Sequence, residues 1–213
     1  MRKALDPAND VGRLTDEELL GRYRESGNAA DFNELVRRYE RELYRYLARY
    51  LGDASLADDV FQNTFLQVHL KRGLYEDGRP VRPWLYSIAT HQAVDALRKV
   101  GRQPTVSLDQ QIDGTASPDA GTLVDLLTTD EPGPLAELQG REREEWVRNA
   151  IAKLPDSLRQ TLIMAYYQDM KYREIADVLN IPLGTVKSRL NSALTKIAEM
   201  GRSILPNGNG AVP

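Results

Sequence analysis

Near the C-terminus a proline divides two helical hydrophobic patterns, and this arrangement constrains the fold more than any other stretch. Residues 172–199 read YREIADVLNIPLGTVKSRLNSALTKIAE. The first pattern must stop at Asn180-Ile181-Pro182, because proline lacks the N–H that a continuing helix needs and restricts the residue before it. Proline is accepted at the start of a helix, so we expect a second helix from Leu183. The inward positions of the first helix are Ile175, Ala176 and Leu179.

The second expected helix has two faces of different character. Its inward face is apolar, with spacings of four, four and three, at Val186, Leu190, Leu194 and Ile197. Its opposite face is small, polar and basic, without an acid, at Thr185, Lys187, Ser188, Arg189, Asn191, Ser192 and Thr195. Such a face after a tight turn is typical of the helix-turn-helix that reads a DNA major groove. The pattern also fits an ordinary helical hairpin with a solvated outer face.

The string EIADVLNIPLGTVKSRL resembles the −35-reading helix-turn-helix of extracytoplasmic-function (ECF, group 4) sigma factors. Their signature contains EIA, an isoleucine-proline turn and then GTVKSR, and all three parts stand here in that order. The resemblance implies a member of the sigma-70 family that binds core RNA polymerase and directs promoter recognition, melting and initiation. It also implies an upstream −10-reading domain. The −35 contacts that it implies are Thr185, Lys187, Ser188, Arg189, Asn191 and Ser192.

Several function classes are disfavoured by what the sequence lacks. Without cysteine, disulfides, thiolate zinc sites and thiol catalysis are excluded. There is no P-loop, dinucleotide fingerprint or nucleophile elbow, and His69 and His91 have no carboxylate spacing typical of a metal site. No apolar run approaches the ~20 residues of a membrane span, and the N-terminus lacks a signal-peptide core. We therefore expect a cytoplasmic protein that is not an enzyme, needs no cofactor or metal and does not insert into a membrane.

The formal net charge of −3 is unevenly distributed along the chain. Residues 31–102 carry twelve Lys/Arg and ten Asp/Glu, and residues 141–205 carry eleven and eight. Residues 103–140 carry seven acids and no Lys or Arg. The two helical blocks are thus only mildly basic, which argues against avid nonspecific binding of free DNA, since such binding needs many phosphate contacts. This mild charge suits a DNA reader that works inside a larger assembly.

An N-terminal lead and one helical domain are expected in the first half of the chain. Residues 1–29 form a lead with one short helix, which begins at a capping box from Thr15 to Glu18 and ends before Gly27. Residues 30–102 form the first helical domain, beginning with a long helix to about Leu51. That helix carries arginines, most of them expected to be solvated, and its inward positions are Phe32, Val36, Tyr39, Leu43, Leu47 and Tyr50.

The next expected helix begins near Ser55 and resembles the helix that docks on the clamp coiled coil of the polymerase largest subunit. The family commonly reads ED-L-V-Q-E there, and this chain reads DD-V-F-Q-N, so Asn63 replaces an acid. The outer patch that would bind core polymerase is Asp58, Asp59, Gln62 and Asn63, opposite the inward Leu56, Val60, Phe65 and Val68.

Residues 73–83 contain two glycines and two prolines and are expected to form a loop. The following stretch WLYSIATHQAVDALRKVGR is similar to the family's WLYRIARNLAIDYLRR, which opens the −10 element. Unpaired bases need rings to stack on and donors to read their edges. We expect Trp84 in the core with Leu85, Ile88 and Leu97, and His91 departs from the usual asparagine. The −10 contacts that the resemblance implies are Tyr75, Tyr86, His91, Arg98 and Lys99.

Residues 103–134 are expected to be a flexible acidic linker, because proline, glycine and acid without lysine or arginine disfavour a packed domain. In the family this connector runs toward the active-site cleft, and a plain solvated tether fits the composition equally well. Residues 135–205 are expected to form a four-helix module that ends in the helix-turn-helix, and residues 206–213 a disordered tail. The first two helices of the four-helix module are expected to meet at Pro155, with Asp156 as a cap. Their expected buried residues are Trp146, Ala150, Ile151, Leu154, Leu158, Leu162, Ile163 and Tyr166.

The sequence thus predicts an all-α protein of two small helical domains joined by a flexible acidic linker. As a sigma factor it would bind core RNA polymerase, at the clamp coiled coil and the flap, and promoter DNA. The family also leads us to expect an anti-sigma factor, since no fused sensor domain is visible. Two alternatives remain open: a free-standing helix-turn-helix regulator with an N-terminal sensor or dimerisation domain, and a polymerase-binding antagonist that never recognises a promoter.

Overall fold

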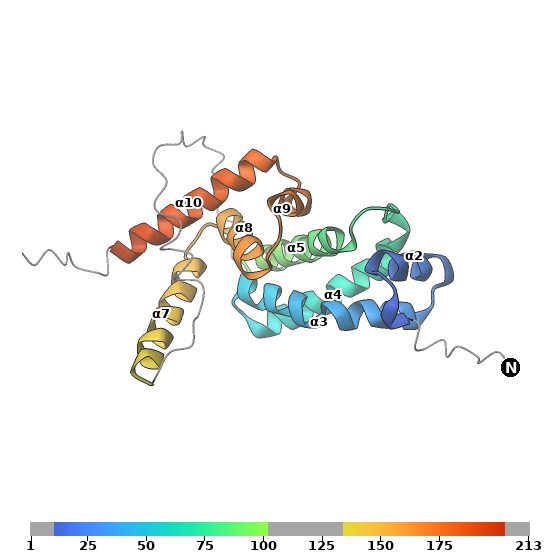
Figure 1. Cartoon of the computed structure of the whole chain (residues 1–213), viewed down its shortest axis with the longest axis horizontal. Helices are drawn as coiled ribbons and strands as arrows, with labels where there is room; N and C mark the ends of the chain where they lie inside the picture. Colours follow the sequence, from blue (N-terminus) through green and yellow to red (C-terminus); the bar gives the residue numbers. More distant parts are fainter. Residues whose placement is uncertain (1–10, 102–133, 203–213) are drawn as a thin grey trace, which may run out of the picture. The chain divides into compact units, whose positions relative to one another are not determined.

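The computed structural model describes residues 11–101 and 134–202. Within these residues the chain forms eight α-helices, two short 3-10 helices and no strand (Figure 1), which confirms the all-α prediction. Most of the expected acidic linker and the tail from residue 206 lie outside the described residues. The elements are η1 (Val11–Arg13), α2 (Asp16–Ser26), α3 (Ala29–Leu51), α4 (Ala54–Lys71), η2 (Arg72–Leu74), α5 (Val81–Lys99), α7 (Pro134–Ala152), α8 (Asp156–Tyr167), α9 (Tyr172–Leu179) and α10 (Leu183–Arg202).

The first helices begin and end as their sequence predicts. The Thr15 hydroxyl accepts from the Glu18 N–H at 3.2 Å, and the Glu18 carboxylate accepts from the Thr15 N–H at 2.7 Å. This pair is the predicted capping box at the start of α2. Gly27 and Gly52 follow α2 and α3 with φ of 67° and 69°, a left-handed conformation that costs glycine little.

Helix α3 is the centre of the first compact unit and packs against α2, α4 and α5. Because three helices surround it, its buried face is wider than one row of side chains. Leu35 and Tyr46 are buried together with the predicted Tyr39, Leu43, Leu47 and Tyr50, whereas Phe32 and Val36 are partly exposed. The Tyr46 hydroxyl lies 2.8 Å from the Thr90 hydroxyl, which links α3 to α5.

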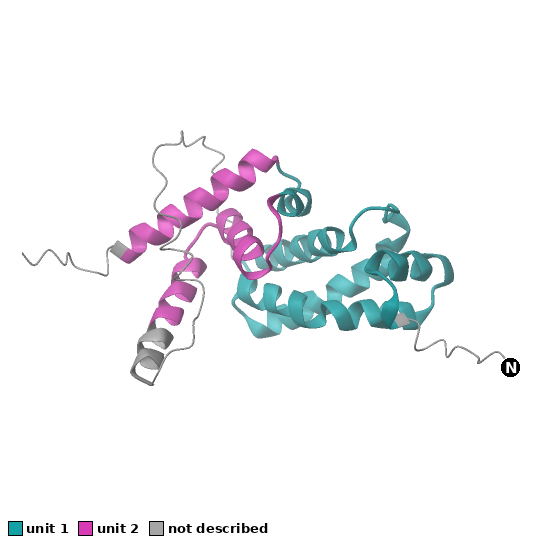
Figure 2. Ribbon diagram, in the orientation of Figure 1, with its two compact units in different colours: residues 1–104, 173–181 teal, residues 105–172, 182–213 magenta. Residues whose placement is uncertain are grey.

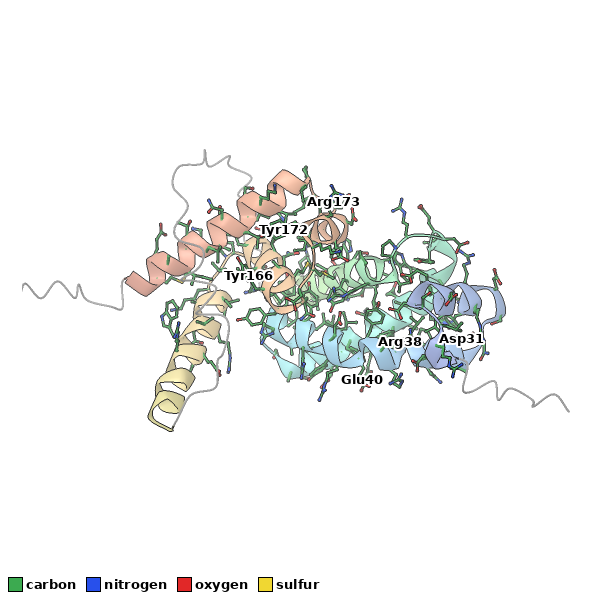
Figure 3. The ribbon with its side chains drawn as sticks, in the orientation of Figure 1. Asp31, Arg38, Glu40, Tyr166, Tyr172 and Arg173 are labelled. Atoms are coloured by element: carbon green, nitrogen blue, oxygen red, sulfur yellow. The ribbon has the colours of Figure 1, made fainter. Side chains whose placement is uncertain are left out.

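One arginine of α3 is structural rather than solvated. Arg38, labelled in Figure 3, donates to the Asp16 carboxylate at 2.7 Å and to the Leu14 carbonyl at 2.8 Å. The Tyr39 hydroxyl donates to the other Asp16 oxygen at 2.5 Å. These hydrogen bonds attach the N-terminal end of α2 to α3.

Helix α5 begins inside the expected loop, at Val81 rather than at Trp84. Pro83 therefore lies in the first turn of the helix. The missing N–H of proline costs little there, since the first N–H groups of a helix have no partner within it. The loop that precedes α5 is correspondingly shorter and comprises residues 75–80, after η2.

In the second unit, α10 packs against α8 and α7. Val147 rather than Trp146 is buried on α7, while Trp146 is partly exposed and its indole lies within 3.3 Å of where a Cβ on Gly201 would stand. Tyr166, which was expected to be buried, is also partly exposed. Asp156 is not the cap of α8: Pro155 occupies that position, and Asp156 is the first helical residue and pairs with Arg159.

The chain divides into two compact units (Figure 2). One comprises residues 1–104 and 173–181, and the other comprises residues 105–172 and 182–213. This division differs from the expected boundaries, because it groups α9 with the first unit and α10 with the second. The two helices remain joined covalently by the turn at residues 180–182.

Candidate functional site

The turn between α9 and α10 has the backbone geometry that its sequence predicts. Asn180 ends α9 in a left-handed conformation, with φ of 51°, and the Ile181 N–H donates to the Ala176 carbonyl at 3.0 Å. The Pro182 carbonyl then accepts from the Thr185 N–H at 2.9 Å and opens α10. The proline thus stands immediately before the helix, which begins at Leu183 as predicted.

The inward and outward faces of α10 follow the predicted pattern. Val186, Leu190, Leu194 and Ile197 are all buried, and Ala193 joins them. We refer to the six predicted −35 contacts together as the recognition face. Among them Lys187, Ser188 and Asn191 are exposed, and Thr185, Arg189 and Ser192 are partly exposed. The first turn of α10 contains no acid that would repel a phosphate.

The predicted docking residues lie together on the outer side of α4. Asp58, Asp59, Gln62 and Asn63 are all exposed, whereas Val60, Phe65 and Val68 face the core. The Asn63 amide donates to the Gln92 side-chain oxygen at 2.5 Å, so this side chain also connects α4 to α5. We refer to these four residues as the α4 polar face.

Next to the α4 polar face lies an apolar row that the sequence analysis missed. Leu66, Leu70 and Leu74 are 53%, 63% and 75% exposed, although leucine is usually buried. Their spacing of four residues places Leu66 and Leu70 along one side of α4, and the row continues into η2. That spacing was the available signal, but a periodic leucine row ordinarily predicts a core face.

The two tyrosines assigned to the −10 element are buried rather than available to DNA. Tyr75 is 3% exposed: its hydroxyl donates to the Arg79 carbonyl, and its ring centroid lies 5.3 Å from that of Trp84. Trp84, expected in the core, is instead partly exposed. The expected 73–83 loop and the implied −10 contact both predicted an exposed ring. The short loop nevertheless folds back and places the ring inside.

Tyr86 is fully buried between α3 and α5. Its hydroxyl donates to the Glu42 carboxylate at 2.8 Å, and Arg82 donates to the same oxygen at 2.8 Å. Burial, together with the charge of Glu42, raises the pKa of Tyr86 above the ordinary range, so the hydroxyl stays protonated. Tyr86 therefore contributes to the packing of the first unit, and its expected role as a base contact stays a prediction.

The remaining −10 candidates lie on the exposed side of α5. His91, Arg98 and Lys99 are exposed, and His91 Nδ1 lies 2.6 Å from the Ser87 carbonyl. Arg98 pairs with Asp95 at 3.4 Å. Since Nδ1 faces a carbonyl it carries the proton when the ring is neutral, which leaves Nε2 as an acceptor. The basic end of α5 is thus accessible to an anionic ligand.

Two residues near this site were also missed by the sequence analysis. Arg24 of α2 donates hydrogen bonds to Tyr75 and Asp77 of the 75–80 loop, and Glu17 of α2 accepts one from Val81, which follows the loop. Their spacing of seven residues places them on one helix face, yet nothing in the sequence indicated which segment that face meets.

Neither metal binding nor membrane spanning is supported in the described residues. No group of three or more His, Cys, Asp or Glu side chains in them is arranged to hold a metal ion. Among the same residues, no helix is both long and apolar enough to cross a bilayer.

Two family models match the chain. The model described as Sigma-70 region 2 matches residues 35–103, and the model described as Sigma-70, region 4 matches residues 144–197. The first match includes the α4 polar face and α5, and the second includes the recognition face. Helix α2 lies outside both matches.

Curated relatives match over most of their length. The chain is 30% identical over 165 residues to the ECF RNA polymerase sigma factor SigW of Bacillus subtilis, covering 78% of this chain and 86% of the relative. It is 30% identical over 175 residues to the RNA polymerase sigma-H factor of Pseudomonas aeruginosa, covering 82% and 88%. It is 28% identical over 178 residues to the ECF RNA polymerase sigma-E factor of Escherichia coli, covering 84% and 90%.

Two solved structures have a similar fold. CnrH, in complex with the cytosolic domain of CnrY, matches with a TM-score of 0.61 and 22% identity over 88% of this chain and 97% of that one. The sigma factor RpoE of Bartonella quintana, in complex with the anti-sigma factor NepR, matches with a TM-score of 0.57 and 20% identity over 81% and 97%. At these identities the likeness concerns the fold.

Proposed function

The chain belongs to the ECF RNA polymerase sigma factors, and from this membership we propose which of its surfaces carry out promoter recognition. A sigma factor binds core RNA polymerase and directs it to promoters, so one surface must dock on the enzyme and others must contact DNA. The observation that carries the assignment is the exposure of the α4 polar face and of the recognition face, each within a matched sigma region.

We assign core polymerase binding to the α4 polar face, against the clamp coiled coil of the largest subunit. Two carboxylates and two amides on exposed helix positions suit a basic and polar partner surface. Asp59 and Gln62 lie outside the buried side of α4, so they are available without unfolding. The exposed leucine row beside them would add apolar area to the same interface.

We assign −35 recognition to α10 and −10 engagement to the exposed side of α5. Lys187 and Asn191 are one turn apart on the recognition face, where side chains of a recognition helix reach base edges. On the exposed side of α5, Arg98 and Lys99 present donors and positive charge and His91 Nε2 presents an acceptor, which suits an opened strand. Melting on this proposal draws on binding energy and not on nucleotide hydrolysis.

An anti-sigma factor is a further proposed partner. This proposal is supported by the similar fold of RpoE from Bartonella quintana, which was solved with the anti-sigma factor NepR. Pull-down of the tagged chain from its native host, followed by transcription assays with the recovered partner, tests it. A partner that binds and lowers promoter-directed transcription would support the proposal.

The test of the docking surface is core binding by the double variant Asp59→Arg, Gln62→Ala. Charge reversal on an exposed helix face should weaken binding of core polymerase about tenfold or more, while helix content and melting temperature stay unchanged. Glu40→Arg, a charge reversal at an exposed position of α3, is the matched control and should bind like wild type. Equal affinity of the double variant and the control would contradict the placement of the docking surface.

Transcription from a candidate promoter then tests the function itself. The full chain with core polymerase should initiate at that promoter, whereas core polymerase alone should not. Binding to palindromic DNA as a dimer without polymerase would indicate a free-standing regulator instead. Binding to core polymerase without initiation at any promoter would indicate an antagonist.

A further inference from the structure

Helix α2 holds the 75–80 loop at both of its ends. At the start of the loop, Arg24 donates to the Tyr75 carbonyl at 3.1 Å and to the Asp77 carboxylate at 2.7 Å. At the other end, the Glu17 carboxylate accepts from the Val81 N–H at 3.0 Å. Glu17 and Arg24 are seven residues apart, about two helical turns, so both lie on one face of α2.

The contact from Glu17 supplies what the start of α5 otherwise lacks. Pro80 stands at the cap position of α5, and its side chain has no atom that accepts a hydrogen bond. The Val81 N–H is one of the N–H groups that a helix leaves without an internal partner. Glu17 provides the acceptor from another helix, and its negative charge lies at the positive end of the α5 dipole.

Between these two attachment points the loop is closed over the side chain of Tyr75. Tyr75 is 3% exposed, its hydroxyl donates across the loop to the Arg79 carbonyl, and its ring packs edge-on against Trp84. Burial raises the pKa of Tyr75, and the charges of Glu17 and Asp77 raise it further. The buried ring thus belongs to the loop that Arg24 and Glu17 attach to α2.

We propose that α2 is a latch that keeps the 75–80 loop closed over Tyr75, with Arg24 and Glu17 as its positioning residues. In this closed state a single-stranded base cannot stack on Tyr75, because the ring is covered. Base stacking at Tyr75 therefore requires that Arg24 first release the loop. That consequence rests on the −10 contact at Tyr75 that the family resemblance implies, whereas the latch itself is a property of the free protein.

The latch is tested by hydrogen exchange of residues 75–83 in the full-length protein. Arg24→Ala should raise amide exchange there by about tenfold, because two hydrogen bonds from one guanidinium are lost. Arg79→Ala is the matched control, since it removes a guanidinium of the same loop that pairs locally with Glu76 and does not contact α2 through its side chain. Equal exchange in Arg24→Ala and Arg79→Ala would overturn the proposal.

Three further variants separate positioning from general loss of folding. Asp77→Asn weakens the same ion pair from an exposed position, 70% accessible, and should open the loop in part without loss of the melting transition. Glu17→Gln keeps an acceptor oxygen for the Val81 N–H and should stay protected, whereas Glu17→Ala should not. If Glu17→Gln and Glu17→Ala exchange alike at Val81, Glu17 is not a positioning residue.

A second readout uses Trp84, whose ring contacts Tyr75, in a Trp146→Phe background that leaves one tryptophan. Acrylamide should quench its emission more strongly in Arg24→Ala than in Arg79→Ala. No difference between the two variants would again overturn the latch.

Binding of a fluorescein-labelled pool of random single-stranded 12-mer DNA separates the latch from the proposed function. Arg24→Ala should bind the pool more tightly than wild type by about tenfold, and adding Tyr75→Ala should remove the gain. If the loop opens by exchange and quenching but the affinity does not rise, the latch stands and the −10 role of Tyr75 is wrong. If the loop does not open, the latch is wrong whatever the DNA affinity.

Discussion

Glu34 lies between two arginines of its own helix and accepts hydrogen bonds from both. Arg37 donates to its two carboxylate oxygens at 2.8 and 2.7 Å, and Arg38 donates at 2.9 Å. The hydrogen bonds from Arg37, and then those from Arg38, lower the pKa of Glu34 to about 2 from an ordinary 4.5. Because the unfolded chain takes up the proton at higher pH, this stabilisation is complete above about pH 4.5 and is lost as the pH falls to about 2.

We therefore expect Glu34→Gln to lower the free energy of unfolding at pH 7 by about 1 kcal/mol, a small value because Arg37 is well exposed and solvent screens the pair. The difference from wild type should shrink as the pH falls from 4.5 toward 2. Urea denaturation of both proteins across this range measures it. Glu40→Gln, at an exposed position of the same helix, is the control for removing one carboxylate charge from α3. A Glu34→Gln difference that does not change with pH would contradict the assigned pKa.

Side-chain exposure is the residue-scale property that the sequence predicted least well. Tyr75 stands among charged, glycine and proline residues, and Trp84 stands in an apolar stretch, yet the tyrosine is buried and the tryptophan partly exposed. The outcome depends on Arg24 and Glu17, which are more than fifty residues away in sequence. A pattern read within one window contains no information on such partners. The burial of Tyr86 was not predicted for the same reason, since its partner Glu42 lies on α3.

Single helices were predicted well because their hydrophobic period and their end signals are local. All four predicted inward residues of α10 are buried, and α10 begins at the predicted Leu183. The errors occur where several helices meet or where two rules compete. Val147 is buried in place of Trp146, because the large indole lies at the edge of the core against Gly201. Pro83 indicated a loop, but proline is compatible with the first turn of α5.

At the scale of α10, Lys187 and Arg189 are expected to have different roles on DNA. They are two residues apart, about 200° around the helix, so they cannot point in one direction. Lys187 is exposed on the recognition face, and Lys187→Ala should cost about 1–3 kcal/mol of promoter binding and relax base preference at one −35 position. Arg189→Ala should weaken all sequences alike and lower the salt slope by roughly one.

The measurement is binding of a −35 promoter library by the holoenzyme at several salt concentrations. Lys196→Ala removes the same charge from α10 about two and a half turns further along and serves as the control for charge alone. Unchanged base preference in Lys187→Ala would show that α10 is docked differently from this assignment.

At the scale of the whole molecule, the distribution of charge separates DNA-reading parts from their connection. The blocks at residues 31–102 and 141–205 carry a small excess of Lys and Arg over Asp and Glu. The charged residues of 103–140 are all acidic. The excess is too small for avid binding of free DNA, so promoter binding should depend on core polymerase to bring both blocks to their elements. The path of the acidic segment was not predictable from composition. A solvated tether and an acidic strand that imitates a nucleic-acid backbone require the same residues.

Neutralising the acidic segment distinguishes these two possibilities. If the segment enters the active-site cleft, its acids would compete with the nascent RNA for basic surface, so we expect Asp109→Asn, Asp113→Asn, Asp119→Asn and Asp125→Asn together to change the pattern of abortive products or the rate of promoter escape. Binding of core polymerase and of the −35 element should stay unchanged, since neither assigned surface includes these residues. The assay is single-round transcription from one promoter, with gel analysis of short RNA products. A control that mutates Gln103, Gln110 and Gln111 to Ala keeps every charge and should behave like wild type. If the neutralised variant also gives the wild-type product pattern, the segment acts as a plain tether and its charge has no part in initiation.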